Sequence, residues 1–228
     1  MIAALDDVGT GVGHPLANIA DPSRAGVIVN SFGSTISLAL SGARYDPAFL
    51  ERTCEAKPGG WSEDWWNGVC ADPEDWLEVV ERAKALGLPE PDGLWRALGD
   101  ERIRAVMPMG PQGFEVYGPS GLAHATASAL FIAAGSDVEN DYDPATTDLY
   151  AHYPDAELIT FVGAGHIMIE QLDVGSLIRM FATAFFGFHL AGDDRYEPLL
   201  TREFVEEDAL GLVEASSFKS LAWGVVED

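Results

Sequence analysis

The chain has 228 residues, of which 37 are acidic and 13 are basic, so its formal charge at pH 7 is −24. Nucleic acid binding needs clustered lysine and arginine, so this charge argues against a nucleic-acid partner and, for the same reason, against an anionic membrane surface. Because 47% of the residues are hydrophobic, the chain is not a disordered acidic tract, and its length suits one folded domain over residues 1–228.

The first readable unit is a strand, a tight turn and a helix. Residues 26–30 form a short apolar run after the turn-forming residues 21–23, which predicts a buried strand. The run breaks at residues 31–34, and the apolar side chains that follow predict a helix to about Ala43.

Residues 46–100 differ in composition, and we expect them to form a lid-like segment inserted into the domain. They hold both cysteines and five of the six tryptophans, namely Trp61, Trp65, Trp66, Trp76 and Trp95. Two interpretations are open for these aromatic side chains. They pack the segment onto the sheet, which we favour, or they form a hydrophobic lid for an acyl or aromatic substrate.

One helix is predicted inside this segment, over residues 73–86. Asp72 is placed to cap its N-terminus, and Pro73 occupies the first helical position, where its missing N–H costs nothing. Gly87 follows as a stop signal at the C-terminus.

Three further strands are expected over residues 103–107, 129–134 and 158–162. Each is a continuous apolar run, as in a parallel sheet covered on both faces. Helices are expected over residues 144–153 and 174–190, so strands and helices alternate. This pattern predicts an α/β fold with a mostly parallel sheet, about four readable strands, and helices on both faces.

No transmembrane or signal segment is expected. The longest apolar candidate, residues 177–190, is shorter than the roughly 18 to 20 residues that a membrane span needs, and it contains Arg179 and His189. Residues 1–11 contain no basic region and no long apolar stretch, so they do not match a signal peptide.

Ser31 lies on the turn between the first strand and its helix, which is the placement of a nucleophile elbow. Such a turn presents the hydroxyl, and the start of the helix supplies N–H groups, so the Phe32 N–H is a candidate oxyanion donor. The pattern around such a serine is G-x-S-x-G. Gly33 matches it, whereas Val29 stands where a small residue is expected and should crowd the approach of strand and helix.

An acid and a base follow two later strands. Asp137 comes shortly after the strand that ends at Ala134, and His166 follows the strand that ends at Val162. The carboxyl ends of parallel strands meet at one crevice, so Ser31, Asp137 and His166 are expected to converge there. In this arrangement His166 takes the proton from Ser31, and Asp137 holds the imidazole tautomer.

At these residues the sequence resembles the α/β-hydrolase fold, most closely the dienelactone-hydrolase-like and bacterial platelet-activating-factor-acetylhydrolase-like proteins. The resemblance covers nearly the whole chain apart from residues 51–72. It rests on residues 26–44 (GVIVNSFGSTISLALSGAR), 130–144 (LFIAAGSDVENDYDP), 158–166 (LITFVGAGH) and 184–200 (AFFGFHLAGDDRYEPLL).

The resemblance implies Ser31 as nucleophile, Asp137 as acid and His166 as base, and it implies no cofactor. A one-residue shift of the loop could instead select Glu139 or Asp141 as the acid. In some relatives the acid follows the preceding strand, but residues 107–110 offer no carboxylate here, which favours Asp137.

The N-terminal side departs from that family. Only 30 residues precede Ser31, so we expect a shortened hydrolase without the strands that come before the elbow strand. The second oxyanion donor, which normally comes from a loop after one of those strands, is therefore missing. The elbow strand should also leave an apolar edge open, which a homo-oligomer would cover.

Other motifs carry weaker signals. Residues 137–143 alternate acidic side chains but lack the glycine and closing glutamate of a calcium loop, so a solvated loop is favoured over a metal site. The glycines of residues 9–13 lack the flanking strand and helix of a phosphate-binding loop. Cys54 has no histidine partner in a motif, and Cys54 and Cys70 are either disulfide-bonded or free thiols.

The predicted function is hydrolysis of a carboxylic ester, either a small ester or a short acyl chain on a lipid, through an acyl-enzyme on Ser31. The alternative is a non-catalytic, hydrolase-derived binding or interaction protein, or an inactive fragment, that lacks a complete oxyanion hole. Val29 and the short N-terminal side favour this alternative, whereas the presence of all three triad residue types favours the enzyme.

Overall fold

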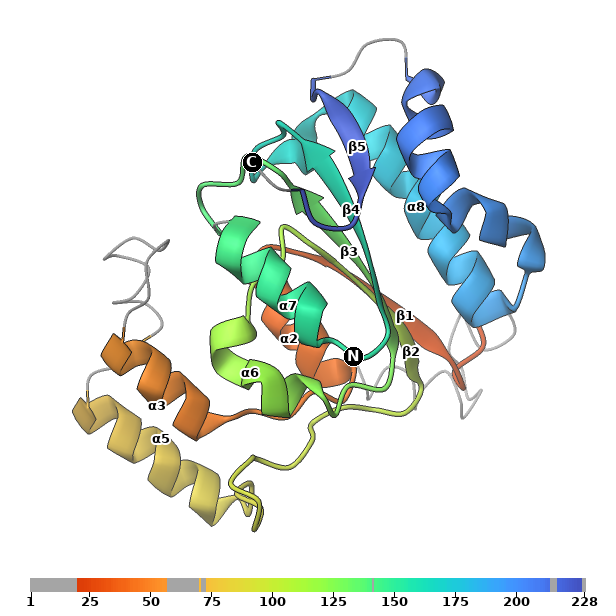
Figure 1. Ribbon diagram of the computed structural model, residues 1–228. Helices are drawn as coiled ribbons and strands as arrows, with labels where there is room; N and C mark the ends of the chain where they lie inside the picture. The colour runs from red at the N-terminus through yellow and green to blue at the C-terminus, as the bar shows by residue number, and fades with distance from the viewer. Residues whose placement is uncertain (1–19, 57–69, 71–72, 141, 214–216, 227–228) are drawn as a thin grey trace.

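A computed structural model describes residues 20–56, 70, 73–140, 142–213 and 217–226 (Figure 1). In this part of the chain a five-stranded sheet lies between two layers of helices. The α/β class and the mostly parallel sheet predicted from the sequence are confirmed.

The strands lie in the sheet in the order in which they occur along the chain. They are β1 (Ala25–Asn30), β2 (Ile103–Met109), β3 (Ser128–Ala134), β4 (Ala156–Val162) and β5 (Ser220–Trp223). The first four are parallel, and β5 pairs antiparallel with β4. Because the parallel strands run in one direction, the loops that leave their C-terminal ends share one edge of the sheet.

The middle of the sheet is fully buried, and β1 forms one edge of it. β2, β3 and β4 are almost wholly buried, as their continuous apolar sequences predict. β1 pairs with β2 alone among the described strands, and its Ile28 is 47% exposed. The open apolar edge predicted for the elbow strand is therefore present in the described part of the chain.

One face of the sheet is covered by the long helix α8 (Leu172–Ala191) (Figure 1). Phe181, Ala184 and Phe185 are completely buried in the core cluster between this helix and the strands. By length and composition α8 could also cross a membrane, but a buried core helix passes the same test. Short helical turns complete this side, namely η2 (Met168–Glu170), η3 (Asp194–Leu200), η4 (Phe204–Asp208) and η5 (Ala209–Leu212).

The other face carries α2 (Gly33–Leu40), α6 (Phe114–Leu122) and α7 (Thr147–His152). Leu38 and Leu149 are fully buried in a second core cluster on this side. Successive residues of the central strands point to opposite faces and belong in turn to the two core clusters, so each central strand is apolar on both faces.

Several elements differ from the sequence prediction. The helix predicted over residues 144–153 begins earlier, with a π-helical turn η1 (Tyr142–Thr146), and continues as α7. The sequence analysis did not predict α6, β5 or the helix α3 (Pro47–Ala56). In α6 a non-helical Gly118, followed by a proline, interrupts the helical pattern.

The described part of the inserted segment packs on the body of the domain through aromatic contacts. It contains α3 and α5 (Pro73–Ala85), and Gly87 ends α5 in a left-handed conformation as predicted. The Trp95 ring lies 4.4 Å from the Tyr45 ring and the Trp76 ring 6.3 Å from it, measured between centroids. These contacts agree with a packing role for the two tryptophans.

The structure decides the state of the two cysteines of this segment but does not describe three of its tryptophans. Cys54 and Cys70 form a disulfide, which settles the alternative that the sequence left open. Asp72 and the tryptophans at positions 61, 65 and 66 lie outside the described residues. The lid interpretation for these three tryptophans stays a prediction.

Candidate active site

Ser31 occupies a strained turn directly after β1. Its φ of +54° makes it the one non-glycine residue with a positive φ in the described part of the chain. Its N–H donates to the carbonyl of Met109 on β2, and its own carbonyl accepts from the N–H of Ser34 in α2. The turn is therefore held from both sides, which is how a left-handed conformation costing about 1–3 kcal/mol persists at a functional residue.

Gly33 explains how the turn accommodates Val29. A Cβ at position 33 would lie 3.1 Å from the Cβ of Val29, closer than such atoms normally approach. The crowding expected from Val29 is real, and the absence of a side chain at Gly33 relieves it. The missing first small residue of the motif therefore does not prevent the elbow from forming.

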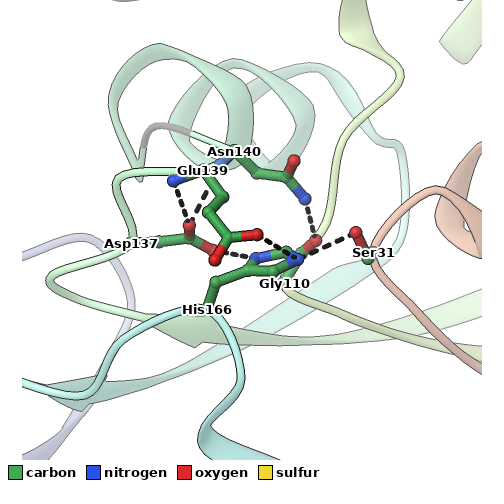
Figure 2. A network of polar contacts seen from close by, with 6 residues as sticks. All are labelled: Ser31, Gly110, Asp137, Glu139, Asn140 and His166. Carbon is green, nitrogen blue, oxygen red and sulfur yellow. Dashed lines mark hydrogen bonds and ion pairs between the residues drawn. The ribbon is translucent and has the colours of Figure 1, made fainter.

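The three predicted residues form one hydrogen-bonded chain, which Figure 2 shows. The Nε2 of His166 lies 2.8 Å from the Oγ of Ser31, and its Nδ1 lies 2.7 Å from the Oδ2 of Asp137. His166 and Asp137 are 8% and 6% exposed, so little water competes for these contacts. The predicted convergence at the C-terminal ends of β1, β3 and β4 is confirmed in its geometry.

The second oxygen of Asp137 is fixed by the main chain. Its Oδ1 accepts hydrogen bonds from the N–H groups of Glu139 at 2.9 Å and Asn140 at 3.0 Å. The carboxylate therefore has three hydrogen bonds, and each one is made to its own loop or to the imidazole. A carboxylate held in this way cannot rotate without breaking at least one of them.

Asn140 and Gly110 join the Asp137 loop to the strand end beside the imidazole, and neither residue was predicted from the sequence. The Nδ2 of Asn140 donates to the carbonyl of Gly110 at 2.8 Å, which ties the Asp137 loop to the end of β2. Gly110 has φ +51°, and a Cβ there would lie 3.2 Å from both Nδ1 and Cε1 of His166. Because glycine has no Cβ, the backbone at position 110 can approach the imidazole ring of His166 closely.

Glu139 approaches the other nitrogen of the ring. Its Oε2 lies 4.0 Å from the Nε2 of His166, and its side chain is 63% exposed at the mouth of the site (Figure 2). The triad acid must bond Nδ1, so Glu139 does not hold that position in this geometry, and Asp137 does. Asp141, the other alternative, lies outside the described residues.

The start of α2 supplies one oxyanion donor. Phe32 follows Ser31 at the N-terminus of this helix, and no hydrogen bond to its N–H is present among the described residues. The N–H of the residue after the nucleophile is one usual donor. The second usually comes from a loop beyond the elbow strand, and β1 has no described neighbour on that side.

Two carboxyl groups outside the hydrogen-bonded chain have raised pKa values. Burial raises the pKa of Glu115, in the first turn of α6, to about 7. Burial and the charge of Asp155 raise the pKa of Glu157 to about 7, but Glu157 lies near the start of β4, far along the strand from His166. Within the described ranges no three His, Cys, Asp or Glu side chains are grouped to hold a metal ion.

Comparison with known proteins adds no assignment. No model of a protein family matches the chain, and a search of curated proteins finds no match either. The interpretation of the site therefore depends on its own geometry.

Proposed function

We propose that the chain is a serine hydrolase that cleaves a carboxylic ester, either a small ester or a short acyl chain on a lipid, through an acyl-enzyme on Ser31. The observation that carries the proposal is the unbroken sequence of hydrogen bonds from Ser31 through His166 to Asp137. The resemblance of the surrounding sequence to dienelactone-hydrolase-like and platelet-activating-factor-acetylhydrolase-like proteins is consistent with it.

The first half of the reaction forms the acyl-enzyme. The Nε2 of His166 takes the hydroxyl proton as the Oγ of Ser31 attacks the ester carbonyl, and the carbonyl oxygen becomes an oxyanion. The Phe32 N–H faces that oxyanion at the positive end of α2. As the intermediate collapses, the imidazolium passes its proton to the leaving alcohol oxygen, and the acyl group stays on Ser31.

The second half returns the enzyme to its starting state. Water attacks the acyl carbon while His166 takes one of its protons, and collapse of the second intermediate returns that proton to Oγ of Ser31. The products are one carboxylic acid and one alcohol, and the reaction as written requires no cofactor. Asp137 stays ionised throughout and holds the Nδ1 proton in place.

A non-catalytic, hydrolase-derived binding or interaction protein, or an inactive fragment, is the second candidate. The observation that favours it is that β1 has no neighbour beyond it among the described strands, so the described residues there add no loop to supply a second oxyanion donor beside Phe32. Loss of one such donor costs about 10²–10³ in rate. A second copy of the chain paired along β1 would cover the edge and could supply the missing donor.

A fluorophosphonate probe separates the two candidates, because it phosphonylates only an activated serine. We expect the purified chain to be labelled, and Ser31→Ala to lose the label. Ser34→Ala is a matched control, since the Ser34 Oγ is buried without a hydrogen-bond partner and lies three residues away. A folded wild-type chain that takes no label would refute the enzyme and support the binding protein.

A further inference from the structure

Glu139 lies where the leaving group must pass. In the proposed reaction His166 Nε2 protonates the leaving alcohol, so that oxygen must come within hydrogen-bond distance of Nε2. The Oε2 of Glu139 is 4.0 Å from the same nitrogen. The leaving group therefore passes beside this carboxylate as its oxygen reaches Nε2.

The main chain of Glu139 is fixed at the mouth of the site. The Glu139 N–H donates to the Oδ1 of Asp137, so the loop that carries the side chain is tied to the triad acid itself. In Figure 2 the Glu139 side chain extends over the imidazole, on the side where Ser31 approaches.

Among the residues that the structure describes, no lysine or arginine forms an ion pair with Glu139. The ion pairs that these side chains make in the described ranges lie elsewhere, for example Arg44 with Asp92 and Arg102 with Asp100. The side chains that follow the three triad residues along the chain, Phe32, Val138 and Ile167, are exposed and apolar. The one ion-pair contact of Glu139 in the described ranges is thus the 4.0 Å approach to His166, and no cationic lysine or arginine there offsets its charge.

We propose that Glu139 is a specificity-determining residue that selects esters of cationic alcohols and disfavours esters with an anionic leaving group. This inference rests on the proposed hydrolase function and adds the substrate class. A quaternary ammonium two carbons from the ester oxygen fits the charge without donating a hydrogen bond to the imidazole.

The size of the preference follows from the geometry. We take the cation to lie about 5–6 Å from the partly exposed carboxylate, with an effective dielectric constant between about 20, for a protein surface, and about 80, for bulk water. Coulomb's law then favours the cationic ester by about tenfold in kcat/KM. An anionic group at the same place is disfavoured by a similar factor. Both factors should shrink at high ionic strength, because Glu139 is exposed to solvent.

The test compares three acetate esters, of which the cationic and the neutral one have nearly equal shape. One has a trimethylammonio-ethyl alcohol, one its neutral 3,3-dimethylbutyl analogue, and one an anionic carboxyethyl alcohol. We measure kcat/KM for each with the wild type, Glu139→Gln and Glu101→Gln. Glu101 is an exposed glutamate before β2, at the opposite end of the sheet, so its variant loses the same charge far from the site.

We expect the cationic-to-neutral ratio to be about ten in the wild type and in Glu101→Gln, and to approach one in Glu139→Gln. A change in imidazole reactivity would alter all three esters equally and leave the ratio unchanged. Two results would refute the role of Glu139 and leave the hydrolase function intact. In the first, the wild type hydrolyses the neutral ester and takes the fluorophosphonate label but shows no charge preference. In the second, Glu139→Gln keeps the preference. If none of the esters is cleaved and Ser31 is not labelled, the proposed function fails together with the role of Glu139.

Discussion

Asp137→Asn tests the hydrogen-bonded chain most directly, because the two carboxylate oxygens have different partners. Oδ1 accepts from two main-chain N–H groups, and Oδ2 bonds His166 Nδ1. An asparagine keeps its oxygen toward the two N–H donors, since the reverse orientation sets donor against donor. Its NH₂ group then faces Nδ1, so the imidazole must move its proton to Nε2 and can no longer accept one from Ser31.

The expected loss is large in activity and small in stability. A wrong tautomer of this kind lowers kcat by about 10⁴, which is roughly 5 kcal/mol of transition-state stabilisation. The folded state keeps both main-chain hydrogen bonds, and the NH₂ group still bonds Nδ1, so the free energy of unfolding should change by about 1 kcal/mol or less. Asp137→Ala removes all three bonds and leaves the buried N–H of Asn140 without its acceptor, at about 1–3 kcal/mol, with a smaller cost at the part-buried N–H of Glu139.

The assay pairs ester hydrolysis and the rate of fluorophosphonate labelling with urea unfolding of the same three proteins. Asp137→Asn should be nearly inactive yet close to wild type in stability, whereas Asp137→Ala should lose both activity and stability. An Asp137→Asn protein that retains activity within tenfold of the wild type contradicts the role given to Asp137. Equal destabilisation by Asn and Ala contradicts the assignment of Oδ1 to the main chain.

Two further outcomes are expected. Burial in the folded state raises the pKa of Glu115 from 4.5 to about 7, so the free energy of unfolding falls as the pH rises through this interval. At pH 8 Glu115→Gln should be more stable than the wild type by roughly 3 kcal/mol, with no difference near pH 4.5. Urea unfolding across this pH range measures the difference, and a difference that does not change with pH refutes the prediction. If a second copy of the chain covers β1, sedimentation equilibrium should show a dimer. Ile28→Lys should dissociate this dimer, because a lysine on an edge strand blocks strand pairing. A wild-type protein that stays monomeric at about 100 µM excludes this interface.

The strands were predictable because each buried parallel strand is a continuous apolar run. β2, β3 and β4 begin and end within two residues of the predicted bounds. β5 was missed because it is four residues long and half-buried, so no apolar run marks it. The helix α6 was missed because Gly118 and the proline after it interrupt its pattern, and packing against the sheet overrides that weak local preference.

The residues of the site were also readable, since a strand followed by a polar residue marks the functional edge of a parallel sheet. Ser31, Asp137 and His166 follow three of the four parallel strands, and the parallel register brings those ends together. The sequence did not reveal Asn140 or the need for glycine at 110, because both depend on how one loop folds over the end of another strand.

The linear order of residues determined the class of the fold and the identity of the three side chains, because alternating apolar runs and the chemistry of serine, aspartate and histidine are local properties. Only the tertiary structure decided which carboxylate meets which ring nitrogen. Asp137 at Nδ1 and Glu139 near Nε2 are two residues apart in the chain, and the path of their loop separates their roles. It also showed that Gly33 makes room for Val29, since a clash depends on the distance between atoms and not on the motif they belong to.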